Sequence, residues 1–60
     1  MNPLEQAHYL TEQFMYALNI KDWGKSKNCA IYLAHNNIRE TLDVEKIRYW
    51  KQVVNEIEKL

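Results

Sequence analysis

The scarcity of chain-breaking residues is the feature that most constrains the fold. The sixty residues contain one glycine, Gly24, and one proline, Pro3, and both stand where helix ends are expected. Along the rest of the chain the apolar residues recur at spacings of three and four, which is typical of amphipathic helices. The sequence therefore predicts one all-α domain over residues 1–60, a small three-helix protomer made of a helical hairpin plus an N-terminal helix.

The first predicted helix runs from Pro3 to about Asn19. Asn2 is its expected N-cap, and Pro3 suits the first helical position because proline has no N–H to lose there. We expect one face of this helix to lie in the core. That face consists of Leu4, Ala7, Leu10, Phe14, Ala17 and Leu18, with Met15 at its margin.

The second predicted helix covers roughly Trp23 to Leu42. Residues 20–26 combine Asp22, Trp23 and Gly24, which predicts a turn with Asp22 as the helix cap. The small alanines of this helix would let a neighbouring helix approach closely. Its predicted buried stripe consists of Ala30, Ile31, Leu33, Ala34, Ile38 and Leu42.

The third predicted helix is capped by Asp43 and continues to Leu60, with Glu45 in a first turn that favours negative charge. Its apolar seam follows heptad spacing for less than two repeats, too short for an independent coiled coil. The seam consists of Ile47, Trp50, Val54 and Ile57, and Tyr49, Val53 and Leu60 widen it to one side.

This apolar arc is wider than one packing contact needs, and two interpretations are open. Both flanks of the third helix could touch the other two helices of the same chain. Alternatively, the extra flank and the far side of the first helix, which carries Tyr9, Tyr16 and Ile20, could bury against a second copy. We favour the second interpretation, a homo-oligomer.

Self-association is also favoured by the size of the chain. A domain of sixty residues buries only about 60% of the surface that its unfolded chain exposes. A lone Cys29 excludes an internal disulfide, and the two histidines do not complete a zinc spacing, so we predict neither metal nor cofactor. The predicted oligomer interface consists of Tyr9, Tyr16, Tyr49, Trp50, Val53, Ile57 and Leu60.

Charge and hydropathy argue against duplex nucleic acid and membranes as partners. Eight basic and eight acidic residues cancel, which makes duplex nucleic acid a poor candidate because such binding neutralises many phosphates. The chain contains neither a run of about 18 apolar residues for a membrane span nor a signal-peptide pattern. We expect a cytoplasmic protein with no membrane partner.

No catalytic constellation is visible, so we predict a protein that is not an enzyme. The only serine, Ser26, stands among lysines, and the two histidines lie on different predicted helices, so no base and orienter are evident for it. Cys29 directly precedes an apolar run, and we expect it to be a buried structural residue.

The start of the second helix is the one feature that suggests a ligand. Two lysines stand in a first turn that already carries partial positive charge, and backbone N–H groups, a glycine and a hydroxyl beside them are ingredients of a phosphate site. Lys25, Tyr32 and Arg39 lie seven apart, hence on one side, with Asn28 and Asn36 between them. The competing interpretation is a solvated polar face. The candidate ligand-binding residues are Trp23, Lys25, Ser26, Lys27, Asn28, Tyr32 and Arg39.

A pattern across the second and third helices resembles small uncharacterised helical proteins encoded by tailed bacteriophages. The residues that carry it are Lys25, Lys27, Cys29, Ala30, Ile38, Leu42, Tyr49, Trp50, Val53, Glu56, Ile57, Lys59 and Leu60. The resemblance implies no catalytic residues. It implies binding of host factors inside the bacterial cytoplasm, including sequestration of nucleotide signals used in antiviral defence.

Two functions follow as hypotheses. The first is a phage-type homo-oligomer that sequesters a phosphorylated small molecule, such as a nucleotide signal. The second is an adaptor or inhibitor that grips a host protein through exposed aromatic helix faces, including Tyr9, Tyr16 and Tyr49.

Overall fold

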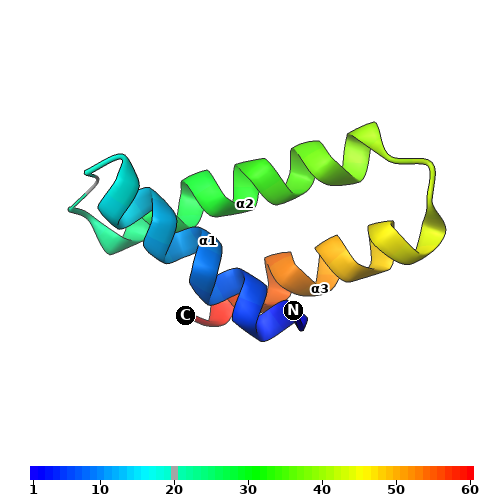
Figure 1. The fold of residues 1–60 in the computed structure, drawn as a ribbon, viewed down its shortest axis with the longest axis horizontal. Coiled ribbons are helices and arrows are strands. Elements are labelled where there is room, and N and C mark those ends of the chain that lie inside the picture. The colour runs from blue at the N-terminus through cyan, green and yellow to red at the C-terminus, as the bar shows by residue number, and fades with distance from the viewer. Residues whose placement is uncertain (20) are drawn as a thin grey trace.

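The computed structural model describes residues 1–19 and 21–60, which form three α-helices and no strand. Helix α1 spans Pro3–Ala17, α2 spans Trp23–Glu40 and α3 spans Val44–Lys59. Figure 1 shows α2 and α3 as an antiparallel hairpin that α1 crosses near the start of α2 and the end of α3. The all-α prediction, a helical hairpin plus an N-terminal helix, is confirmed for the described residues.

The three predicted N-caps, Asn2, Asp22 and Asp43, are confirmed. In each case the side-chain oxygen accepts a hydrogen bond from a backbone N–H of the first turn, which would otherwise lack a partner within the helix. The donors are Glu5 at 2.8 Å, Lys25 at 3.1 Å and Glu45 at 2.9 Å, respectively.

Helices α1 and α2 end two residues before the predicted positions. Asn19 has φ 55, the left-handed region that closes a right-handed helix. The Thr41 hydroxyl accepts a hydrogen bond from the Asp43 N–H at 3.2 Å, a local alternative to helix continuation. Leu42, predicted to be buried, is therefore 98% exposed, and that prediction is wrong.

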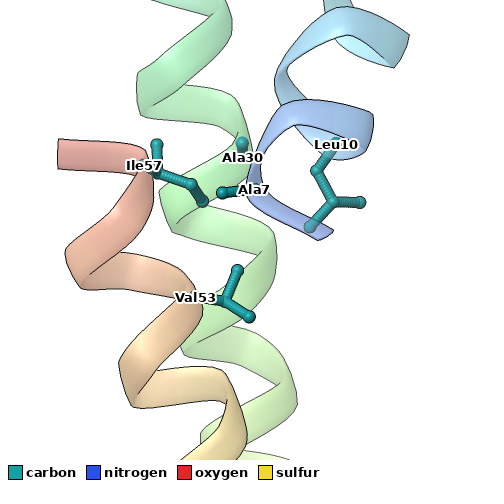
Figure 2. Packing of buried hydrophobic residues seen from close by; sticks show 5 residues of the cluster. All are labelled: Ala7, Leu10, Ala30, Val53 and Ile57. Atoms are coloured by element: carbon teal, nitrogen blue, oxygen red, sulfur yellow. The ribbon is translucent and has the colours of Figure 1, made fainter. Parts of the chain in front are cut away.

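The core is centred on two alanines. Ala7 of α1 and Ala30 of α2 have no exposed surface, and they lie beside Ile57 of α3 in Figure 2. Leu10 and Val53 complete this cluster. Alanines at a helix crossing permit close approach of the two backbones, so the three helices meet at a compact cluster that buries little apolar area.

The predicted buried face of α1 is too long. Leu4, Ala17 and Leu18 are exposed, because α1 crosses the hairpin (Figure 1) and its buried residues, Ala7, Leu10 and Thr11, lie in the middle of the helix. Phe14 is half-buried against the core cluster. The prediction for Ile20 lies outside the described residues.

Helix α3 is covered on both flanks within one chain. Val53 and Ile57 have no exposed surface, so their prediction as oligomer-interface residues is wrong. Trp50 and Leu60 pack half-buried against the same cluster. The wide apolar arc of α3 therefore serves the protomer's own core, as the first of the two interpretations held.

Tyr49, another predicted interface residue, instead ties α3 to the start of the chain. Its hydroxyl lies 3.0 Å from the Met1 carbonyl oxygen and 3.2 Å from Gln6 Oε1 and can donate to either. Its ring meets Trp50 edge to face, with centroids 5.4 Å apart. Burial raises the pKa of the Tyr49 phenol above its ordinary value of 10.0, and the Glu5 carboxylate raises it further.

Two hydroxyl side chains are fully buried, and only one of them has a hydrogen-bond partner. Thr11 Oγ1 donates to the Ala7 carbonyl oxygen at 2.9 Å. Ser26 has 0% exposure, and its Oγ has no hydrogen-bond partner among the described residues. A buried polar group without a partner lowers the free energy of unfolding.

Ser26→Ala should therefore raise the free energy of unfolding by about 1 kcal/mol, because it removes an unsatisfied buried hydroxyl. The measurement is urea denaturation followed by circular dichroism. The matched variant, Ala30→Ser, adds a hydroxyl to a fully packed position one turn later and should lower that free energy. Destabilisation by Ser26→Ala would contradict the burial of an unpaired hydroxyl.

Candidate functional site

The start of α2 does not assemble the predicted phosphate site. Ser26 is fully buried, so its hydroxyl cannot reach a ligand in solvent, and that prediction is wrong. Lys27 Nζ donates to the Glu58 carbonyl oxygen at 3.4 Å, in the last turn of α3. Of the three predicted phosphate ligands, only Lys25 is exposed without such a contact to α3.

The chain itself compensates the positive charge at this helix start. The Asp22 carboxylate caps α2, next to the Lys25 N–H. The Lys27 ammonium donates a hydrogen bond to the Glu58 carbonyl oxygen at the end of α3. Unpaired carbonyl groups at this helix end carry partial negative charge. The two lysines therefore need no bound anion.

The other predicted ligand residues lie along the outer side of α2. Lys25, Asn28, Tyr32 and Arg39 are exposed, and Tyr32 is 66% exposed. Arg39 donates a hydrogen bond to the Asn36 side chain. Trp23, the first residue of α2, is 37% exposed. The predicted row of cations, amides and one aromatic ring is thus an exposed face of α2.

Three depressions lie on the side of the molecule formed by α1 and α2. The one between the two helices has a volume of about 200 Å³ and is lined by Leu10, Gln13, Phe14, Ala17, Leu18 and Leu33. The one on α2, of about 390 Å³, is lined by Phe14, Asn28, Cys29, Tyr32, Leu33 and Asn36. The one on α1, of about 240 Å³, is lined by Tyr9, Glu12, Gln13, Tyr16 and Ala17.

These depressions form one continuous surface, which we call the α1–α2 face. The first and second share Phe14 and Leu33, and the first and third share Gln13 and Ala17. Among the described residues, none from α3 lines any of the three. The α1–α2 face therefore lies away from α3, and no part of residues 1–19 and 21–60 covers it.

Several residues of the α1–α2 face were predicted to be core residues. Phe14 and Leu33 are half-buried, and Leu18 is 61% exposed. Cys29, predicted to be buried, is half-buried and lines the depression on α2. The helical spacing identified these side chains as apolar-face residues but could not show that α3 fails to reach them.

Tyr9 and Tyr16, two predicted interface residues, are exposed on α1 and line its depression. They lie on the α1–α2 face, whereas Tyr49 and Trp50 belong to the packing of α3. The structure therefore separates the predicted interface residues into an exposed group on α1 and a group that packs inside the protomer.

Within residues 1–19 and 21–60, no three His, Cys, Asp or Glu side chains come together to hold a metal ion. None of the helices in this part of the chain could cross a membrane. No protein-family model, no curated protein and no solved structure matches the chain.

Lys27→Met should lower the free energy of unfolding by about 0.5 kcal/mol at low salt, because the end of α3 loses a nearby cation. The loss should shrink at high salt. Lys25→Met is the matched control, since it removes an exposed cation from the same turn without a contact to α3. Equal effects of the two variants in urea denaturation would contradict the role given to Lys27.

Proposed function

We propose that this protein is a non-enzymatic interaction module that binds a protein partner through the α1–α2 face. The observation that carries the proposal is the continuous apolar surface around Phe14 and Leu33, which no other part of the described chain covers. Contiguous apolar surface with polar edges is typical of protein–protein contact sites. A groove between two helices suits the apolar side of a third.

Three exposed tyrosines support a protein partner. Tyr9 and Tyr16 stand on the α1 side of the face, and Tyr32 stands on the α2 side. Tyrosine is enriched in protein interfaces because one rigid side chain supplies both apolar area and a hydroxyl. This arrangement favours the adaptor hypothesis, although Tyr49 does not take part in it.

A phosphorylated small molecule is less well supported. Lys25 and Arg39 stand fourteen residues apart on α2, about 21 Å along the helix axis, which is too far to hold one phosphate. The three depressions are shallow and open, whereas a small-molecule site encloses most of its ligand. Sequestration of a nucleotide is therefore the competing outcome in the test below.

The resemblance to phage-encoded helical proteins agrees with this class of function, because it implies binding of host factors rather than catalysis. The identity of a host factor does not enter the proposal. The proposal concerns the surface that is used and the kind of partner, a protein with an exposed apolar helix.

Photo-crosslinking at position 32 tests the proposal. A benzophenone amino acid in place of Tyr32 should give covalent protein adducts in cells that naturally contain the chain, and Leu18→Lys in the same chain should abolish them. The matched control places the benzophenone at Leu42, which is 98% exposed, follows the end of α2 and lines none of the three depressions, and should give none.

Two results would contradict the proposal. One is an absence of protein adducts at position 32 beyond those at position 42. The other is a nucleotide that raises the melting temperature of the wild-type chain but not of Lys25→Ala, which would assign the face of α2 to a small ligand.

A further inference from the structure

We infer that the partner of the α1–α2 face is a second copy of this chain, packed about a two-fold axis so that α1 of each copy lies on α2 of the other. The inference rests on the proposed function, because it names the occupant of the same surface. It is carried by the distribution of charge between α1 and α2.

The two helices that form the face have opposite net charge. Helix α1 contains Glu5 and Glu12 and no lysine or arginine, which leaves it with two negative charges. Helix α2 contains Lys25, Lys27 and Arg39 against Glu40, which leaves it with two positive charges. Lys27 contacts the end of α3, so the cations of α2 that remain for the outer side of the helix are Lys25 and Arg39, both exposed.

The charges of α1 form a row with its exposed tyrosines. Glu5 and Glu12 lie seven residues apart, as do Tyr9 and Tyr16, and all four are exposed. Seven residues are close to two helical turns, so these side chains share the outer side of α1. Glu12 lines the same depression as the two tyrosines, which places it at the acidic edge of the α1–α2 face. Glu5 continues this row toward the start of α1, where its charge also acts on Tyr49 of α3.

The charges of α2 form the opposite edge. Lys25, Tyr32 and Arg39 also lie seven apart and are exposed, and Tyr32 lines the depression on α2. The apolar middle around Phe14 and Leu33 separates this basic edge from the acidic edge on α1. The face therefore runs from acidic through apolar to basic.

A surface with this order is complementary to itself. A two-fold axis that runs along the groove places the apolar middle of one copy on that of the other. The same rotation sets the acidic edge of each copy against the basic edge of its partner. The equal seven-residue period of the two rows lets α1 and the partner's α2 match along their length.

A dimer interface would cover a substantial share of the surface of so small a chain. A standard interface buries about 800 Å² per partner, which is about a fifth of the 4318 Å² accessible surface of this chain. An interface of that size would take in the outer sides of α1 and α2 together with the three depressions. Covering them would also add apolar burial to a protomer in which seven apolar side chains of the described residues are buried.

Charge reversal provides the test. One variant combines Glu5→Lys with Glu12→Lys, and the other combines Lys25→Glu with Arg39→Glu. Wild-type protein should sediment as a dimer. Each variant alone should have a dimer dissociation constant at least about tenfold higher, because like charges then face each other. An equimolar mixture of the two variants should recover the wild-type affinity, because opposite charges again meet at both edges.

The matched control combines Arg48→Glu with Lys51→Glu, two exposed cations on α3, and should leave the dimer intact. Circular dichroism checks that every variant retains its helices, and the mixture experiment excludes misfolding as the cause of dissociation. A wild-type chain that stays monomeric up to about 1 mM, or a mixture that fails to dimerise, would overturn the inference. If position 32 of such a monomer still cross-links to another protein, the proposed function stands and only self-association falls.

Discussion

The contact of Ala7 and Ala30 beside Ile57 is the constraint on which the rest of the structure depends. Because alanine is small, the backbones of α1 and α2 can approach closely, but the contact buries little apolar area. Helix α1 crosses the hairpin at one end (Figure 1), so both flanks of α3 are covered while the outer sides of α1 and α2 are not. The α1–α2 face is therefore a consequence of how the core is built.

The helix starts could be predicted from sequence, whereas the extent of the buried faces could not. A cap such as Asn2 or Asp43 depends on a hydrogen bond to a residue two or three positions away, which local sequence specifies. Leu4 and Leu18 are exposed because of the way α1 crosses the hairpin. Helical spacing defines an apolar side but carries no information about how much of it a neighbour covers.

The difference between local and tertiary information also explains which parts of the candidate site could be predicted from the sequence. The exposed row of Lys25, Tyr32 and Arg39 was predictable because seven-residue spacing alone places it on one side of α2. The phosphate site was not, because Ser26 turns into the core and Lys27 contacts the end of α3. Both depend on the antiparallel pairing of α2 with α3, a tertiary fact. The same pairing offsets the positive charge at the start of α2, because it brings Lys27 to the partially negative end of α3.

The central claim is that the α1–α2 face, and not α3, is the surface that a second copy covers. Two-dimensional ¹H–¹⁵N NMR spectra of the backbone amides, recorded over a dilution series, measure directly which residues a second copy contacts. The account predicts concentration-dependent shifts at Phe14, Tyr32 and Leu33, with Val53 and Ile57 unchanged. Shifts centred on α3, or spectra that stay the same at every concentration, would contradict it.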